Sequence, residues 1–277
     1  YLYLTFNKVM KRNSNNILHL DKDDKGILRL TMDDHSNKNA LSELMMNELI
    51  NAINSAATDN STKVIVIAAK GGVFCSGHNL KEITEARSND DGGSSYFINL
   101  FKLCSSLMQL IVNSPKPVIA EVDGIATAAG CQLVASCDLA ISSNTAKFAT
   151  PGVNIGLFCS TPMVALSRTV NKKDAMKMLL TGDMIDANEA KRISLINDHV
   201  SQDQLTESVL ELAEKISQKS SITVKTGKEA FYEQYEMSLC DAYKYTSKIM
   251  TENTLRDDAK EGINAFFEKR DPSWRDN

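Results

Sequence analysis

Two segments of this 277-residue chain combine a short apolar run with a turn of small residues. In the first, Val66–Ala69 precedes a glycine-containing turn that ends at Gly77 and is followed by His78. In the second, Pro117–Val122 precedes the small-residue segment Gly124–Gly130. Each pattern predicts a buried strand, a tight turn and a helix start, where unpaired backbone N–H groups favour negative charge. Two such turns side by side would direct two N–H groups at one carbonyl oxygen, as in an oxyanion hole.

Small residues at a turn are also explained by the conformation of the turn alone. Side chains that could transfer protons beside the two turns would be a more specific sign of catalysis. Glu82 and Glu85 follow the first turn and are equally typical of a solvated helix surface. The His78 imidazole is expected to face solvent and to titrate near neutrality. Cys159–Thr161 offers a thiol and two hydroxyls, but no adjacent base that would activate them is identifiable.

The elements that must position these turns follow from hydrophobic periodicity. Strands are expected over Gly26–Asp33, Lys63–Lys70, Pro117–Val122, Asp138–Ser142 and Lys147–Thr150. Helices are expected over Leu41–Ala57 (with Ser42 as cap), Asn79–Ala86, Tyr96–Val112, Pro162–Val170, Lys172–Leu180, Ala187–Ile193, Gln202–Gln218, Ser221–Tyr235 and Thr251–Lys269. Alternating strands and helices predict an α/β core, and the pattern after Thr161 is almost wholly helical. The polar segment Ser88–Ser95 is expected to be a mobile excursion.

Composition excludes several classes of protein. The hydrophobic share is 43% and the charged share 24%, which is typical of a globular chain. Lys and Arg total 31 against 35 Asp and Glu, a net charge of −4, so no overall basic field favours nucleic acid. Uninterrupted apolar runs are far shorter than the roughly 18 residues of a membrane span, and none is expected. The six cysteines and four histidines lack metal-ligand spacing, which predicts no metal and reduced thiols.

The first 20 residues contain no acidic side chain but include Lys8, Lys11 and Arg12. That composition suits the tail of an organelle transit peptide, and an ordinary terminus is the alternative. The expected location is accordingly an organelle, or the cytoplasm if the segment is not a targeting signal.

Five ordered motifs resemble the enoyl-CoA hydratase/isomerase (crotonase) superfamily from about Asp23 to Trp274. They are Phe74–Glu82, Gly124–Leu133 with Ala135–Asp138, Phe148–Gly156, Leu180–Gly182 and Glu261–Arg270. The resemblance implies a crotonase-like β-β-α spiral core over residues 23–200 and a helical C-terminal trimerisation region over 201–277, preceded by an N-terminal segment over 1–22. It also implies the mitochondrial matrix as the location, a homotrimer or hexamer, and a role in fatty-acid or lipid metabolism. The implied substrate or ligand is a coenzyme A thioester, without another cofactor.

The resemblance assigns roles to residues at the two turns. The family's oxyanion amides fall on the backbone N–H groups of His78 and Ala129. Family hydratases use two glutamates around one water, and those positions hold Gln132 and Gly152 here. A glutamine amide does not ionise and glycine has no side chain, so neither acts as general acid or base. Ordinary hydration is therefore expected to be weak or absent, with Gln132 retained to orient a water.

The remaining assignments concern coenzyme A. By resemblance the binding residues are Lys38, Ala40, Gly77, Leu80 and, reaching a phosphate from a neighbouring subunit, Lys269. Three kinds of function stay open: an enzyme that uses the oxyanion hole for a thioester-enolate step such as decarboxylation, a non-catalytic acyl-CoA-binding regulator of lipid metabolism, and a scaffold with a vestigial pocket.

Overall fold

A computed structural model describes residues 17–276 of the chain. Its larger sheet has six strands in the order β1-β2-β3-β5-β7-β10. Their bounds are Leu18–Lys22 (β1), Ile27–Met32 (β2), Val64–Ala69 (β3), Val118–Val122 (β5), Leu139–Ser143 (β7) and Asp198–Val200 (β10). The strand β1 is antiparallel to β2, and all other pairs in this sheet are parallel.

The smaller sheet is built mostly from strands that follow directly after strands of the larger sheet along the chain. Its order is β4-β6-β8-β9, with bounds Val73–Cys75, Ile125–Thr127, Lys147–Ala149 and Ile185–Asp186. Each of β4, β6 and β8 follows directly after β3, β5 or β7, and the first three strands of this sheet are mutually parallel. Repetition of strand, second strand and helix therefore winds the chain as a β-β-α spiral, as expected.

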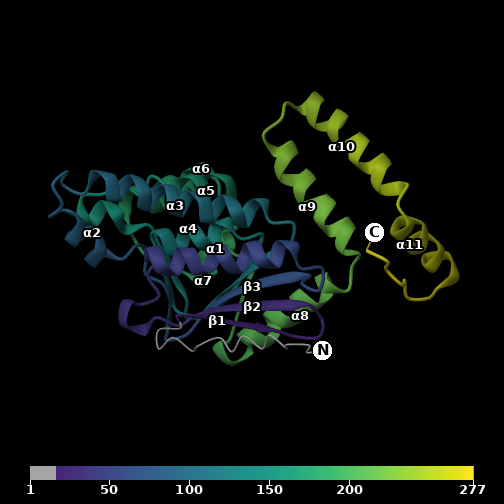
Figure 1. The fold of residues 1–277 in the computed structure, drawn as a ribbon, viewed down its shortest axis with the longest axis horizontal. Coiled ribbons are helices and arrows are strands. Elements are labelled where there is room, and N and C mark those ends of the chain that lie inside the picture. The colour runs from purple at the N-terminus through teal and green to yellow at the C-terminus, as the bar shows by residue number, and fades with distance from the viewer. Residues whose placement is uncertain (1–16, 277) are drawn as a thin grey trace, which may run out of the picture.

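One face of the larger sheet is covered by α1 (Glu43–Thr58), α3 (Ser94–Asn113) and α4 (Ala129–Ser136) (Figure 1). Ser42 caps α1 by accepting the Met45 N–H, and buried side chains recur at helical spacing along the helix. The other face is covered by α8 (Leu205–Ser217), whose apolar side chains pack on β2, β3, β5 and β7. The sheet is thus buried on both sides, which explains its runs of β-branched residues.

Shorter helices complete the body of the molecule. They are η1 (His35–Asn37), α2 (Leu80–Ala86), η2 (Pro151–Ile155), α5 (Pro162–Thr169), α6 (Lys172–Thr181), α7 (Ala187–Arg192) and η3 (Gln202–Gln204).

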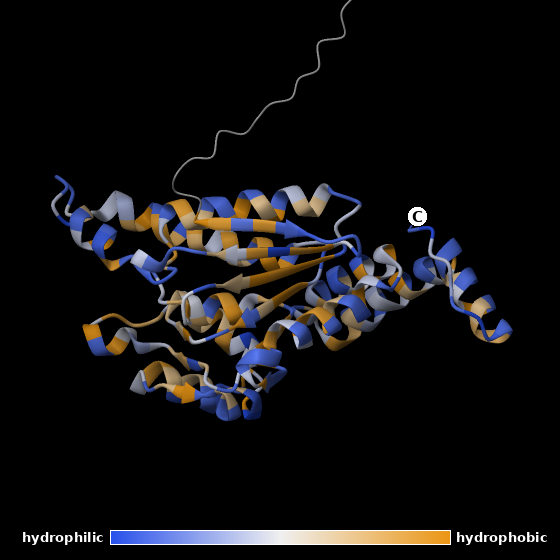
Figure 2. Ribbon diagram, turned by 90° about the horizontal axis from the view of Figure 1, so that it is seen from below, coloured by the Kyte–Doolittle hydropathy of each residue, from blue (hydrophilic) through white to orange (hydrophobic). Residues whose placement is uncertain are grey.

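The last three helices extend away from the body as an arm (Figure 1). They are α9 (Ser221–Tyr235), α10 (Leu239–Thr254) and α11 (Asp257–Glu268). Lys228 fastens α9 to the body by donating to the carbonyls of Ile111 and Lys116 and to the Asp138 carboxylate at 2.6 Å. Large apolar side chains on the arm are exposed: Phe231, Tyr235, Leu239, Tyr243, Met250, Leu255, Ile263, Phe266 and Phe267. Figure 2 shows hydrophobic colouring both in the sheet and on these projecting helices.

Most predicted elements are confirmed to within a few residues, and three expectations are wrong. The helix predicted over Thr251–Lys269 is two helices, α10 and α11, separated at residues 255–256. The segment Gly124–Gly130 contains the strand β6 before its helix, and two short strands, β9 and β10, interrupt the helical last third. Non-local pairing with β8 creates β6, which local periodicity does not reveal.

The expected division at residues 22/23 and 200/201 stays a prediction. Leu18–Lys22 pairs with β2, and α8 packs on the sheet of the body. The transit-peptide interpretation concerns residues that largely lie outside the described part of the chain. The segment Ser88–Ser95 forms turns and the first residues of α3.

Among the described residues, α3 is long and apolar enough to cross a membrane by length and composition. Its buried side chains, Leu100, Cys104, Leu107, Met108 and Ile111, lie on one face. That face belongs to the main hydrophobic core with α1 and α4, so α3 has the packing of a core helix.

Candidate functional site

The two strand-to-helix turns identified in the sequence lie side by side. The strands that lead into them, β4 and β6, are parallel neighbours, with Val73 opposite Ile125 and Cys75 opposite Ala126. Beyond the strands, the Thr127 hydroxyl donates to the Ser76 carbonyl at 3.2 Å. Parallel strands bring their carboxyl ends to one edge, and the turns that follow therefore meet there.

Two glycines allow this close contact. Gly77 has φ +99°, and a Cβ there would lie 3.0 Å from the Ala128 Cβ and 3.6 Å from the Ala129 nitrogen. A Cβ on Gly130 would overlap the Cys75 carbonyl. At Gly130 backbone lies against backbone, and at Gly77 an added Cβ would press on the Ala128 Cβ, so a side chain at either position would push the two turns apart.

The orientation of the His78 amide follows from its own peptide unit. The Leu41 N–H donates to the Gly77 carbonyl at 2.8 Å, which fixes that carbonyl toward Leu41. In a trans peptide the carbonyl and the following N–H point in opposite directions. The His78 N–H therefore points away from Leu41, and it donates to no group within residues 17–276.

The Ala129 amide is oriented in a similar way. The Ala128 carbonyl accepts the Gln132 N–H at 3.0 Å as the first bond of α4, so the Ala129 N–H points out of the helix start. Ala128 has φ +51° and ψ −116°, a conformation that non-glycine residues rarely adopt. Its own N–H donates to the Ala149 carbonyl, whereas the Ala129 N–H has no acceptor in the described part of the chain.

The His78 ring is packed inside the site, and the expectation that it faces solvent is wrong. Its Nδ1 lies 3.3 Å from the Leu41 carbonyl, which only accepts, so Nδ1 carries a proton. The ring makes an edge contact with Phe101 of α3 at 5.6 Å between centroids. Its Nε2 is buried without a partner among residues 17–276, and burial lowers the pKa of the imidazole. The neutral form therefore dominates at pH 7.

At the first glutamate position, Gln132 is buried in α4. Its Oε1 accepts from the Cys104 thiol of α3 at a sulfur–oxygen distance of 3.8 Å. Burial raises the pKa of Cys104 to about 12, so this thiol stays protonated and donates. The interaction holds the amide in a fixed place without supplying an acid or base.

Residue 152, where the resemblance implies the second glutamate, has no free space beside it. A Cβ on Gly152 would lie 2.5 Å from the Leu157 carbonyl and 2.9 Å from the Cys159 sulfur. Cys159 is buried and its pKa is raised by burial, which a hydrogen bond from the Gly152 backbone partly opposes. Its thiol is therefore protonated at neutral pH and is a poor nucleophile in this state.

The two carboxylates considered as substitutes for the family glutamates, those of Glu82 and Glu85, differ in their surroundings. Glu82 is half-buried, accepts from the Asn79 amide at 2.9 Å and from the Tyr96 hydroxyl at 3.1 Å. Glu85 is exposed on α2. The Glu82 carboxylate interacts electrostatically with His78 and favours the charged form of its imidazole. Of these two glutamates, Glu82 is therefore the one that acts on the first turn.

The residues expected to bind coenzyme A fall into two places. Lys38 is exposed and Ala40 buried in the segment beside the first turn, and Leu80 is an exposed residue at the start of α2. Lys269 is exposed at the end of α11, on the opposite side of the molecule from α2 (Figure 1). Within one chain, Lys269 is therefore not brought together with the others.

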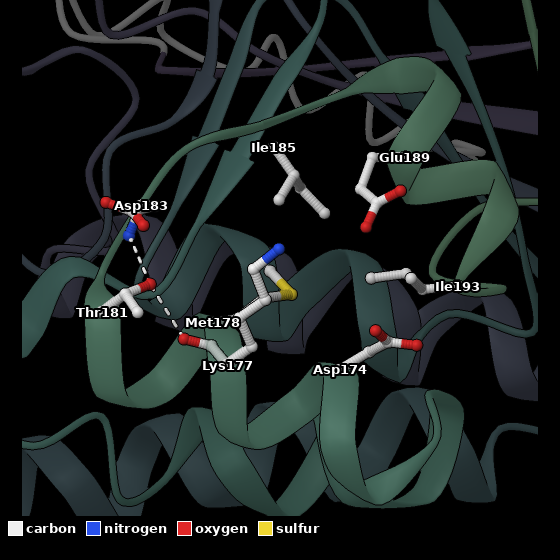
Figure 3. A pocket seen from close by; sticks show the side chains of 8 residues that line it. All are labelled: Asp174, Lys177, Met178, Thr181, Asp183, Ile185, Glu189 and Ile193. Carbon is white, nitrogen blue, oxygen red and sulfur yellow. Dashed lines mark hydrogen bonds between the residues drawn. The ribbon is translucent and has the colours of Figure 1, made fainter.

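Among the described residues, no group of three His, Cys, Asp or Glu side chains is placed to hold a metal ion. A small cavity of about 20 Å³ lies between α6 and α7 (Figure 3), with room for roughly one water. It is lined by Asp174, Lys177, Met178, Thr181, Asp183, Ile185, Glu189 and Ile193. None of these residues belongs to the two turns, so this cavity is separate from the site.

Comparison with known proteins establishes the family. The model of the enoyl-CoA hydratase/isomerase family matches residues 22–277. The chain belongs to the enoyl-CoA hydratase/isomerase family. It is 47% identical to "Enoyl-CoA hydratase domain-containing protein 3, mitochondrial" of Xenopus laevis over 249 residues, 90% of this chain and 83% of that protein. The protein of the same name from Homo sapiens is also 47% identical, over 90% of this chain and 80% of its own.

Solved structures agree with the assignment to the enoyl-CoA hydratase/isomerase family. The crystal structure of human enoyl Coenzyme A hydratase domain-containing protein 3 has a TM-score of 0.88 and 44% identity, covering 93% of this chain and 100% of that one. An enoyl-CoA hydratase from Mycobacterium smegmatis gives a TM-score of 0.89 and 43% identity, covering 93% and 98%. The crotonase fold and the family resemblance inferred from the five motifs are confirmed.

One part of the site was missed by sequence reasoning. Lys38 and Ala40 were expected only to bind coenzyme A, yet the segment Lys38–Leu41 that contains them also forms hydrogen bonds with the first turn. Asn39 is buried there with φ +50°. Asparagine adopts this left-handed conformation more readily than most residues, and that preference was the available signal.

Proposed function

We propose that this protein binds an acyl-CoA thioester and holds its carbonyl oxygen with the N–H groups of His78 and Ala129. The observation that carries the proposal is the pair of amides at two touching turns, each oriented by a bond to its own peptide carbonyl and each without an acceptor in residues 17–276. Donors fixed in advance stabilise developing charge on a thioester oxygen without reorganising.

Ordinary hydration of an enoyl-CoA is proposed to be weak or absent. Gln132 cannot transfer a proton, and the closed surroundings of Gly152 leave no place for a carboxylate. Each missing general acid or base lowers turnover by about 10²–10⁴. The remaining machinery suits a reaction that needs enolate stabilisation more than a strong base, such as decarboxylation or another lyase step.

A non-catalytic acyl-CoA-binding regulator is the second candidate. It is favoured by the Cys159 thiol beside Gly152, which is protonated at neutral pH. It is also favoured by Glu82 near the first turn, whose carboxylate already accepts hydrogen bonds from two neighbouring side chains. The relatives named above are described as mitochondrial. This protein is accordingly expected in the mitochondrion. By resemblance to the family, we further propose a role in fatty-acid or lipid metabolism and a trimer or hexamer in which Lys269 contacts coenzyme A bound to a neighbouring subunit.

Calorimetric titration tests the binding proposal. Butyryl-CoA is expected to bind more tightly than S-butyl-CoA, the thioether that lacks the carbonyl, because only the thioester accepts the two N–H groups. His78→Ala keeps the backbone donor and should retain this preference. Equal affinities for thioester and thioether contradict the carbonyl assignment, and absence of binding to both favours a scaffold.

A separate assay tests the prediction on hydration. The purified protein is incubated with crotonyl-CoA, and loss of the conjugated double bond is followed by absorbance. Turnover within about tenfold of a two-glutamate relative contradicts the proposal, because two lost carboxylates should cost far more. A panel of acyl-CoA substrates then separates the lyase from the non-catalytic regulator.

A further inference from the structure

We propose that Asn39 is a positioning residue that aims the His78 N–H at the ligand carbonyl. This inference rests on the proposed function. Asn39 touches neither reacting atoms nor the amide itself; it acts through the backbone of two segments that meet beside the first turn.

The Asn39 side chain joins three pieces of backbone. Its Oδ1 accepts the Asp34 N–H at 2.7 Å. Its Nδ2 donates to the carbonyls of Lys70 at 2.8 Å and Val73 at 2.7 Å. The side chain is 1% exposed, so these bonds are shielded from competition with water.

These bonds hold the segment Lys38–Leu41 against the chain that leads into the first turn. The Ser76 N–H donates to the Lys38 carbonyl at 3.3 Å, and the Leu41 N–H donates to the Gly77 carbonyl at 2.8 Å. Asn39 lies between the two residues of the segment that make these contacts. Its bonds to Lys70 and Val73 fix the distance at which the segment lies from β4.

The consequence for His78 is geometric. Gly77 can rotate its peptide because glycine is permissive, so the direction of the next N–H depends on what holds the Gly77 carbonyl. Leu41 holds it, and Asn39 holds Leu41 in place. Loss of Asn39 should therefore release the His78 N–H from its orientation. Because Lys38 and Ala40 flank Asn39 and are proposed to bind coenzyme A, affinity for the thioether should fall as well, but by less than affinity for the thioester.

Asn39→Gly is the informative variant, because it removes all three bonds and tolerates the backbone φ of +50°. The matched control is Asn37→Ala, in the same loop, whose amide nitrogen donates to the Asp34 carboxylate and not to the turn. Calorimetric titration of the full chain with butyryl-CoA and S-butyl-CoA gives the ratio of the two affinities. The ratio separates recognition of the carbonyl from binding of the remaining ligand.

Asn39→Gly should reduce the preference for the thioester by about three- to tenfold, the effect of losing one hydrogen bond, beyond any loss of affinity that the thioester and the thioether share. Asn37→Ala should keep the wild-type ratio. A wild-type ratio in Asn39→Gly, or an equal loss of both affinities, overturns the positioning role. A wild-type protein without any preference instead overturns the proposed function itself. If Asn39→Gly does not fold, Asn39→Asp, which keeps the acceptor and loses both donors, carries the same test.

Discussion

At the scale of single residues, two positions determine which chemistry this site can support. Gln132 is buried with a thiol as its partner, and Gly152 has no room for a side chain because the Leu157 carbonyl and the Cys159 sulfur lie against it. The position proposed for the second glutamate is therefore also closed to a longer side chain. Gly152→Glu alone should not give hydration activity.

Gly152→Ala tests this closure. The added methyl should destabilise the protein by about 1–3 kcal/mol, since a backbone carbonyl must move to accept it. Gly227→Ala in α9 is the control, because nothing lies within 4 Å of its added Cβ and alanine favours the helix. Thermal unfolding should show a lower Tm for the first variant and an unchanged or higher Tm for the second. Equal Tm values for the two variants would show that the segment Leu157–Cys159 moves to accept the methyl group without a loss of stability.

His78 gives a prediction on pH. Burial lowers the pKa of its imidazole in the folded protein below the unfolded value of about 6.5. Between these two values the unfolded chain binds more protons, so the free energy of unfolding rises with pH and levels off above about 6.5. His78→Ala lacks this contribution. Urea unfolding of both proteins should therefore show a wild-type advantage that shrinks as pH falls from 7.5 to 5; parallel pH profiles would contradict the assignment.

At the scale of elements, the site exists because β4 and β6 deliver two turns to the same edge. Gly77 is where the turns touch, and its replacement should wedge them apart. Gly77→Ala is expected to abolish the preference for a thioester over a thioether and to destabilise the protein. Gly72→Ala is a matched control: Gly72 also has positive φ, at +71°, but nothing lies within 4 Å of an added Cβ.

Both variants should lose roughly 1–2 kcal/mol of stability from the left-handed backbone alone. Only Gly77→Ala should lose the thioester preference, which titration with butyryl-CoA and S-butyl-CoA measures. If Gly77→Ala retains that preference, the contact between the two turns does not set the direction of the amides.

At the scale of the whole molecule, the arm formed by α9, α10 and α11 exposes many large apolar side chains to solvent. Phe266 is 79% exposed and Phe267 is 76% exposed, beside several other large apolar side chains of the arm. Exposed apolar patches of this kind mark interaction surfaces, and copies of this chain are the expected partner.

Phe266→Ser combined with Phe267→Ser should therefore lower the mass of the assembly in solution. Met184→Ser, which removes an exposed apolar side chain from the body, serves as the control and should leave the mass unchanged. Sedimentation velocity at micromolar protein concentration measures both. A wild-type protein that sediments as a monomer would contradict the role of the arm in assembly.

The amino-acid sequence by itself determined the local elements and the chemical content of the site. Periodic apolar residues predicted α1 and α9, β-branched runs predicted β3 and β5, and ordered motifs identified the family. These features follow from side-chain spacing along a single segment, and spacing is visible in the sequence. The sequence likewise placed Gln132 and Gly152 at the two positions where the family resemblance implies glutamates, and neither side chain can transfer a proton.

Only the tertiary structure decided how the site is arranged. The directions of the His78 and Ala129 amides depend on carbonyl partners, and for His78 that partner, Leu41, lies far away along the chain. Burial of the His78 ring depends on Phe101 of α3, and closure at Gly152 depends on residues 157–159. A residue's type fixes what it can donate or accept, but which group meets it is set by packing between distant segments.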